Sequence, residues 1–489
     1  MEVNPHVSEY CADEKPLLQA ITRDLWALRL RRLQNRVTYD SETDTEGQSQ
    51  VFSSQSEGES VGSQTTRGSR RRQQANTSGA VSLSETLVIC YVGTLLLRVP
   101  FTVADFVSRV DKGELLYYQA AKHVPGNLRE RLPGEFQVLL EPQHLLRPSM
   151  LHQRSLKLAT LLSNEFGMVL PPVNQPLLLF RWMQDLALPI EVYAATQRLA
   201  RILHVGFTLH PASQQSGPGF LPRSQVLRYP EVQLMALLVV STKLFFPLDD
   251  IDRHPVSAND LSALQMDWSA WVATYSSASN PDVSQHQTLT PHMTFPEAFN
   301  ISETDCLAMG DEELDRYLDW YEENLASENV REQGRAGRDA DFRRTLMRMF
   351  PTQSSRPTAS SSLPLRGEAE SEGNGGGEDT SLAHQASDAT QRLRQVQHAL
   401  RPKKIAVSAG GKEGDEGVPR AGSFYRRQRE VKDLEGPVRL LYTKAAELAG
   451  TSLENMTKAV FLTERQLQKS EERARKGAHS GDDDDDVGQ

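Results

Sequence analysis

Two segments of the chain are apolar on every side of the helix that each predicts. The first, residues 87–97, is closed by Pro100. The second, residues 231–245, follows Pro230 and precedes Pro247. Proline fits the first turn of a helix but cannot continue one, so these prolines mark helix boundaries. Since a helix without a polar face must be covered by other elements, both segments are predicted to be central helices of helical bundles.

Further predicted helices flank the first apolar segment. Residues 17–36 carry leucine and isoleucine at helical spacing, which predicts an amphipathic helix. Ser82 with Glu85, and Thr102 with Asp105, match the capping-box pattern at the start of a helix. A similar order recurs around residues 231–245, so the chain is predicted to hold two copies of one helical unit.

Two further helices, residues 176–186 and 190–203, precede the second apolar segment and complete a unit of five. A helix at residues 150–166 would lie between the two copies or cap the first. The predicted fold class is therefore all-α, with tandem five-helix bundles, disordered insertions and a C-terminal helical pair.

Polar segments separate these folded parts. Stretches rich in Ser, Gly, Glu and Gln cannot bury enough apolar surface to fold and are predicted to be disordered. The predicted organisation is a first bundle at 17–125 with a disordered insertion at 38–81, a connecting helical segment at 126–170, a second bundle at 171–275, a partly ordered tail at 276–350 with an acidic helix at 312–325, a disordered segment at 351–423, a helical pair at 424–476 and an acidic tail at 477–489.

Composition narrows the function classes. The net charge of −10 argues against a nucleic-acid coat protein, so any DNA contact must come from local basic patches. The three cysteines, Cys11, Cys90 and Cys306, are far apart and provide neither a disulfide framework nor a zinc ribbon. The N-terminus lacks an apolar signal segment, and no apolar run approaches the ~20 residues that span a bilayer. We therefore expect an intracellular protein with no membrane association.

Catalytic signatures are absent from the sequence. Residues 410–412 resemble a phosphate-binding loop only in part, and the histidines lack the paired spacing of a zinc hydrolase. Asp249 and Asp250 could form an acid/base pair, but adjacent carboxylates at a helix end more often occupy a solvated loop. The chain is predicted to work by binding, with no small-molecule substrate.

One basic group lies within a predicted folded region, the second bundle and the loop that enters it. Its members are Arg198, Arg201, Arg223, Arg228 and Lys243. They would contact DNA phosphates or, as the alternative, pair with Glu191, Glu231 or a partner protein.

A second candidate surface is the acidic helix. Its apolar stripe consists of Leu314, Tyr317, Leu318, Tyr321 and Leu325. A free helix of this length is marginal unless it docks, so the stripe is predicted to bind a bundle of this chain or a partner subunit.

Three further basic clusters lie in polar segments. Arg67 with residues 70–72, and Arg401 with residues 403–404, suit nuclear import or are solvated charge runs. Residues 426–429 follow Phe424 and Tyr425, a combination that suits nucleic acid or an acidic partner.

The duplicated helical order resembles the tandem cyclin folds of TFIIB-like factors. Several sequence segments, taken together, resemble the TFIIB-related subunit of the fungal RNA polymerase I core factor. They are residues 87–98, 186–193, 233–243, 314–322 and the final helical pair. The resemblance implies a nuclear and nucleolar core-factor subunit. Its implied partners are the other core-factor subunits, TBP, RNA polymerase I and the ribosomal DNA core promoter.

One departure and two alternatives accompany this resemblance. Family members begin with a zinc ribbon, for which this chain starts too late, so we expect a fragment or a ribbonless variant without a cofactor. A cyclin that binds a kinase would share the fold, and kinase co-purification would distinguish it. A helical scaffold without DNA contact is the other alternative, against which DNA binding would argue.

Overall fold

The computed structural model describes residues 15–43, 82–142, 144–209, 226–249, 251, 253–255, 263–276, 293–326, 379–403, 422 and 424–479. The chain divides into two units, residues 1–285 with 389–489, and residues 286–388. Regular structure in the described residues is helical except for one short antiparallel ladder, in which β1 (Leu264–Gln265) pairs with β2 (Arg401–Pro402). The all-α prediction is confirmed apart from this ladder.

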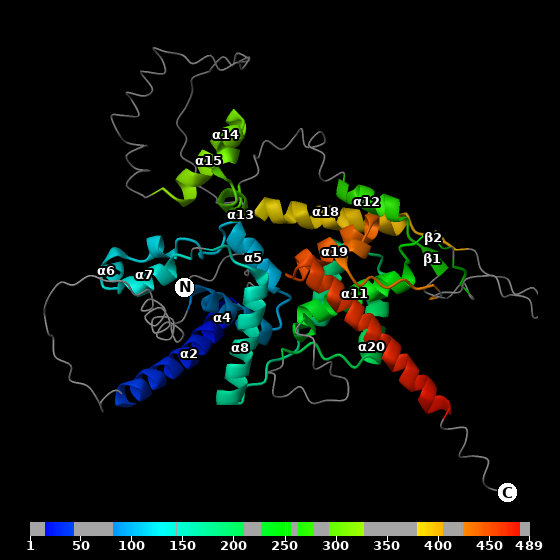
Figure 1. Cartoon of the computed structure of the whole chain (residues 1–489), viewed down its shortest axis with the longest axis horizontal. Helices are drawn as coiled ribbons and strands as arrows, with labels where there is room; N and C mark the ends of the chain where they lie inside the picture. Colours follow the sequence, from blue (N-terminus) through cyan, green and yellow to red (C-terminus); the bar gives the residue numbers. More distant parts are fainter. Residues whose placement is uncertain are drawn as a thin grey trace, which may run out of the picture. The chain divides into compact units, whose positions relative to one another are not determined.

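The central helix of the N-terminal bundle is α4 (Leu83–Leu96), whose side chains are buried on opposite sides. It packs against α2 (Lys15–Thr43), α5 (Val103–Asp111) and α8 (Pro148–Phe166) (Figure 1). The predicted central role of residues 87–97 is confirmed. Since α8 packs on α4, it caps the first bundle, which is one of the two positions expected for it.

Close packing between α2 and α4 depends on Gly93. A Cβ at this position would lie 3.2 Å from Leu18 Cδ1 and 3.2 Å from Thr22 Oγ1. The buried face of α2 therefore runs through Leu18, Thr22 and Leu25, while Leu17 is exposed. The predicted insertion at 38–81 is wrong at its start, because α2 continues to Thr43; residues 44–81 lie outside the described residues.

One of the two predicted capping boxes forms. At α5, the Thr102 side chain accepts from the Asp105 N–H, and the Asp105 carboxylate accepts from the Thr102 N–H at 2.7 Å. At α4, Ser82 occupies the N-cap position without a side-chain cap. Arg154 donates to the Ser82 hydroxyl instead, and Glu85 forms an ion pair with Arg29. Long-range partners thus replace the predicted local pair.

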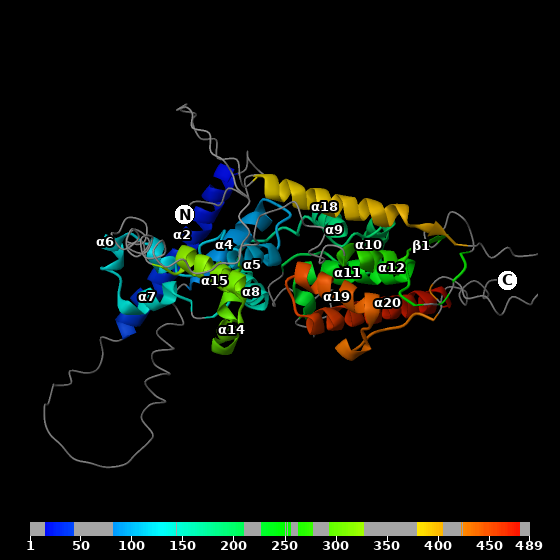
Figure 2. The same ribbon diagram turned by 90° about the horizontal axis from the view of Figure 1, so that it is seen from above.

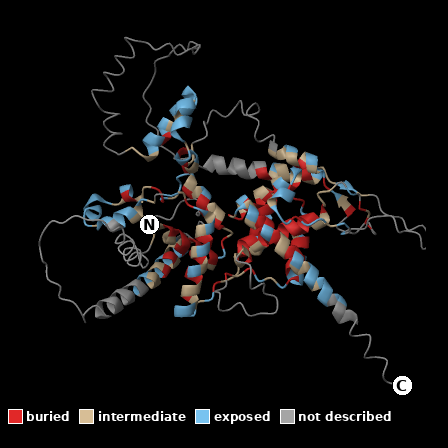
Figure 3. Cartoon of the chain, in the orientation of Figure 1, coloured by how far each residue is buried: buried red, intermediate tan, exposed pale blue. Residues whose placement is uncertain are grey.

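The second bundle forms around α11 (Pro230–Phe245), which is buried along nearly its whole length (Figure 3). α9 (Gln175–Asp185) and α10 (Glu191–Ile202) pack against it. The C-terminal helices α19 (Gly436–Leu448) and α20 (Leu453–His479) also pack directly on α11. The predicted helical pair is confirmed, and it contributes to the core of the second bundle.

The remaining elements of the first unit are shorter or peripheral. They are η1 (Ala120–His123), α6 (Gly126–Arg129), α7 (Gly134–Leu140), η3 (Val226–Arg228), α12 (Trp268–Ser276) and η7 (Val431–Asp433). The prediction of disorder over 351–423 is wrong in part, because α18 (Asp379–His398) lies within that range. Its second half runs alongside α9 and α10 (Figure 2), where Gln397 accepts from the Ile190 N–H and donates to Glu191.

The second unit contains α13 (Phe295–Phe299), α14 (Glu303–Ala308) and α15 (Asp311–Asn324). Trp320 is the buried residue of α15 and lies 5.2 Å from Phe295, measured between ring centroids. The expected acidic helix is therefore present, and an aromatic contact fixes its inner face.

Candidate nucleic-acid and partner interface

Helix α10 directs two arginines of the predicted basic group toward solvent. Its buried face is formed by Val192, Ala195 and Leu199, whereas Arg198 and Arg201 are exposed. The two arginines lie one turn apart, so both guanidinium groups are available on the same stretch of surface.

The carboxylates expected as alternative partners of these arginines are engaged elsewhere. Glu231 is buried, and Glu191 accepts a hydrogen bond from Gln397. Among the described residues, no carboxylate lies within ion-pair distance of Arg198 or Arg201. Pairing with Glu191 or Glu231 is therefore excluded.

For two other members of the predicted basic group, the structure says less about whether they can contact DNA. Arg228 is half-buried at the end of η3, directly before α11. Arg223 lies outside the described residues.

The prediction that Lys243 contacts DNA is wrong. Its side chain is 5% exposed, and its Nζ lies 2.5 Å from Glu464 Oε1 on α20. It also donates to Gln428 Oε1 at 2.5 Å. Burial lowers the pKa of Lys243, and the adjacent Glu464 carboxylate offsets part of this effect. This lysine joins α11 to the C-terminal helices.

Tyr425 completes the cluster around this ion pair. Its hydroxyl donates to Glu464 Oε1 at 2.6 Å, and Lys243 Nζ lies 4.8 Å from the centroid of its ring. One aromatic of the 424–429 motif therefore has a structural role inside the protein. Phe424, the other, is 71% exposed.

A second buried carboxylate lies where the two bundles meet. Glu231 Oε1 accepts from the Tyr91 hydroxyl of α4 at 2.8 Å, and Oε2 accepts from the Val103 N–H at 3.2 Å. Burial raises the pKa of Glu231 to about 8, and these two hydrogen bonds oppose the shift. The start of α11 is thus hydrogen-bonded to two elements of the first bundle.

The C-terminal pair also reaches the first bundle. His152 Nε2 of α8 lies 3.2 Å from the Ala449 carbonyl, and burial lowers the pKa of this imidazole to about 4. Gly450, with φ of +60°, approaches Ala104 so closely that a Cβ would lie 3.3 Å from its backbone nitrogen. The turn between α19 and α20 therefore packs against the first bundle.

Helix α15 keeps most of its predicted stripe at the surface. Leu318 is 51% exposed and Tyr321 is 47% exposed, and Leu314 is also exposed. Tyr317 turns inward, with its ring centroid 6.2 Å from that of Trp320, and Leu325 is half-buried. The exposed part of the stripe remains a candidate docking surface.

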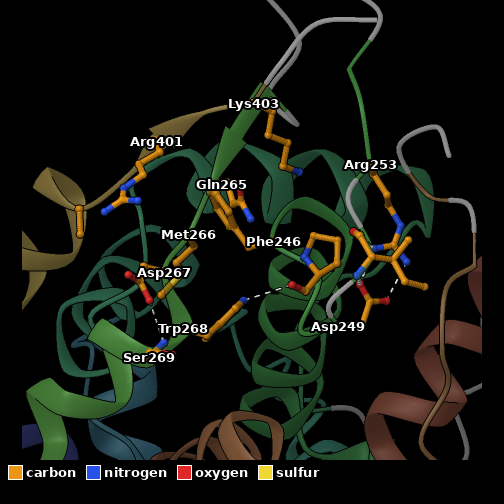
Figure 4. Close-up of a pocket in the computed structure, with 13 residues that line it drawn as sticks. Phe246, Asp249, Arg253, Gln265, Met266, Asp267, Trp268, Ser269, Arg401 and Lys403 are labelled. Atoms are coloured by element: carbon orange, nitrogen blue, oxygen red, sulfur yellow. Dashed lines mark hydrogen bonds and ion pairs between the residues drawn. The ribbon is translucent and has the colours of Figure 1, made fainter. Parts of the chain in front are cut away.

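A pocket of about 430 Å³ lies between the end of α11, the start of α12 and β2 (Figure 4). Asp249 pairs with Arg253 at 2.5 Å, and the hydrogen bond from this guanidinium lowers the pKa of the Asp249 carboxyl. Trp268 Nε1 donates to the Pro247 carbonyl at 3.2 Å. In these contacts the polar groups of the lining bond to one another. They do not point together into the pocket as the polar groups of a catalytic site would. Asp250 lies outside the described residues.

The described part of the chain contains no group of three or more His, Cys, Asp or Glu side chains placed to hold a metal ion. None of its helices is long and apolar enough to cross a membrane.

Two helical bundles, each formed around an apolar central helix, define a protein with tandem cyclin domains. The family models "Rrn7/TAF1B, N-terminal cyclin domain" and "Rrn7/TAF1B, C-terminal cyclin domain" match residues 14–126 and 144–325. The chain belongs to the Rrn7/TAF1B family, as its resemblance to the TFIIB-related factors of RNA polymerase I implied.

Individual relatives are more distant. The "RNA polymerase I-specific transcription initiation factor rrn7" of Schizosaccharomyces pombe is 24% identical over 324 residues, which are 64% of this chain and 58% of the relative. The match thus spans less than two thirds of that relative. A chain of the crystal structure of S. cerevisiae core factor matches 96% of this chain and 98% of its own length, with a TM-score of 0.38 and 11% identity.

Proposed function

We propose that this chain is a subunit of an RNA polymerase I core factor. In this role it binds the ribosomal DNA core promoter and helps to recruit RNA polymerase I for rRNA transcription, in the nucleus and nucleolus. Membership of the Rrn7/TAF1B family supports the proposal. Its partners are the other core-factor subunits, TBP, RNA polymerase I and duplex DNA, and it acts by binding rather than catalysis.

The observation that carries DNA binding is the exposed arginine pair on α10. Arg198 and Arg201 lie on the second cyclin domain without a carboxylate partner among the described residues. In a chain of net charge −10, phosphates are attracted only to such local positive surfaces. Arg228, half-buried directly before α11, would extend this surface; Arg223 lies outside the described residues and stays a proposed contact from the sequence alone.

The test is a salt titration of duplex binding by the Arg198→Ala, Arg201→Ala double variant. Phosphate contacts release counterions, so losing two of them should flatten the slope of log K against log [salt] by about 1.8 and weaken binding to every sequence. Lys444→Ala with Lys458→Ala is the matched control, because each of these lysines has a carboxylate partner on its own helix. Wild-type affinity and slope in the arginine variant would reject this surface.

We also propose that the exposed part of the α15 stripe is a partner-binding surface. Leu314, Leu318 and Tyr321 face solvent, while Trp320 holds the helix from its other side. Exposed apolar side chains on a helix that is fixed by a separate contact suit docking to a groove on another subunit. Leu318→Asp with Tyr321→Asp tests this surface without touching Trp320.

A further inference from the structure

A second exposed basic surface lies on the C-terminal helical pair, away from α10. We name it the C-terminal basic face, and its members are Arg426, Arg427, Arg465, Lys469 and Arg473. All five side chains are exposed. They come from two segments that lie almost forty positions apart in the sequence.

Contacts with α20 bring these two segments together. Tyr425 donates to Glu464 Oε1, and Arg427 Nη1 donates to Gln468 Oε1 at 2.7 Å. The two acceptors are one helical turn apart, so residues 425–427 run along this part of α20. Arg427 therefore lies beside Arg465 and Lys469, and Arg426 is its neighbour in the chain.

The outer part of α20 presents the rest of the face. Met456, Ala459 and Val460 are buried toward the bundle, whereas Arg465, Lys469 and Arg473 are exposed; Figure 3 shows the same change from buried to exposed along α20. From Arg465 to Arg473 the helix rises about 12 Å, about a third of one turn of B-DNA. The positive charges are therefore spread over a length that faces several phosphates.

These charges are not neutralised locally. Among the described residues, no carboxylate lies within ion-pair distance of Arg465, Lys469 or Arg473. Glu471 and Glu472 lie on the same stretch of helix, and Glu472 accepts from Gln468 Nε2 at 3.0 Å. Asp433 lies near Arg426 and offsets part of its charge, so the excess positive charge of the face is carried mainly by Arg427, Arg465, Lys469 and Arg473.

The lack of apolar anchors distinguishes this face from a protein-docking surface. Protein interfaces have a desolvated centre of aromatic or aliphatic side chains. Phe424, at the edge, is the one large apolar side chain that is mostly exposed in the described residues from 422 to 479. A surface of exposed cations without an apolar centre is suited to a polyanion with regularly spaced charges.

We infer that the C-terminal basic face binds the phosphate backbone of duplex DNA, independently of sequence. The inference rests on the proposed promoter binding and adds a second contact surface to that on α10. Because Tyr425 and Glu464 fix the face to the second cyclin domain through Lys243, both surfaces belong to one folded body. The face would hold DNA flanking the segment that α10 contacts.

The experiment measures binding of the full chain to a duplex of about 30 base pairs over a range of salt, by fluorescence anisotropy. Arg465→Ala with Lys469→Ala should flatten the salt slope by about 1.8 and weaken binding roughly tenfold per lost contact at 0.1 M salt, on every duplex. Lys444→Ala with Lys458→Ala removes the same charge from the same helical pair and should change neither quantity. Phe424→Ala should also leave duplex binding unchanged, because the bases of a duplex are stacked on one another and an aromatic side chain cannot stack on them.

The outcomes separate this inference from the proposed function. If the wild-type chain does not bind duplex DNA, both fail. If Arg198→Ala with Arg201→Ala weakens binding but Arg465→Ala with Lys469→Ala matches the control, the inference alone is overturned. Loss of a co-purifying subunit with unchanged DNA binding would make the face a protein interface. The face would instead be a site for single-stranded nucleic acid under two conditions. Phe424→Ala would have to weaken binding to single strands only, and Arg465→Ala with Lys469→Ala would have to leave duplex binding unchanged.

Discussion

Replacing Lys243 by methionine should loosen the C-terminal helices from the second cyclin domain. The side chains of Lys243 and Glu464 are 5% and 2% exposed, and their charged atoms are 2.5 Å apart. Methionine fills a similar volume but leaves the Glu464 carboxylate buried without its cation. Removing one partner of a buried ion pair costs about 3–5 kcal/mol.

The companion variant separates the ion pair from general packing. In Lys243→Met with Glu464→Gln, no charge remains buried, and the glutamine can still accept a hydrogen bond from Tyr425. Since neutral replacements of buried pairs are often tolerated, the double variant should recover most of the lost stability. The interaction energy from the double-mutant cycle should therefore be large.

Amide hydrogen exchange in α19 and α20 is the appropriate assay, because these helices can open without global unfolding. A loss of 3–5 kcal/mol corresponds to a fall in protection of about 150- to 5000-fold for amides that exchange through this opening. A fall of less than about tenfold in Lys243→Met, or a double variant no better protected than the single one, would refute the reasoning. Unchanged salt dependence of DNA binding in the double variant would agree with a structural role for Lys243.

Three further perturbations test other parts of the structure. The pKa of Glu231 is about 8 in the folded chain and near 4.3 in the unfolded chain. The free energy of unfolding of the wild type should therefore fall as pH rises between these values, by up to about 1.4 kcal/mol per pH unit. Urea unfolding of Glu231→Gln should show no such fall with pH. Gly450→Ala places a Cβ 3.3 Å from the Ala104 nitrogen at φ of +60°, so its melting temperature should fall, and an unchanged value would contradict the packing described. Leu318→Asp with Tyr321→Asp should abolish capture of core-factor subunits while circular dichroism stays the same, and normal capture would rule the stripe out.

The parts of the fold that could be predicted are those set by periodicity over many residues. Helices α4 and α11 were predicted as central because neither has a polar face, and that pattern does not depend on any distant partner. The helical pair at 424–476 was predicted in the same way, and Gly450 suits the turn between its helices because glycine is the usual residue where a helix ends in a left-handed conformation.

The buried charges could not be predicted, because their environment depends on residues distant in sequence. Lys243 at the end of an apolar helix is typical of a solvent-facing cation, and its partner Glu464 follows 221 positions later. Glu231 is typical of an acidic residue in the first turn of a helix, yet Tyr91 of the other bundle covers it.

The acidic helix shows a different limit. Leucine and tyrosine positions at helical spacing predicted the stripe, but the residue that packs inward is Trp320, which lies outside that stripe. Its partners Phe295 and Phe299 precede it by more than twenty positions, so spacing within the helix could not identify the buried face.

Purification of the tagged full chain from the organism that encodes it, followed by mass spectrometry of the co-purifying proteins, tests the proposed function most directly. A core-factor subunit should bring down the other core-factor subunits together with RNA polymerase I. Recovery of a protein kinase catalytic subunit, with no core-factor or polymerase subunit, would instead identify the tandem cyclin domains as a kinase partner and contradict the proposal.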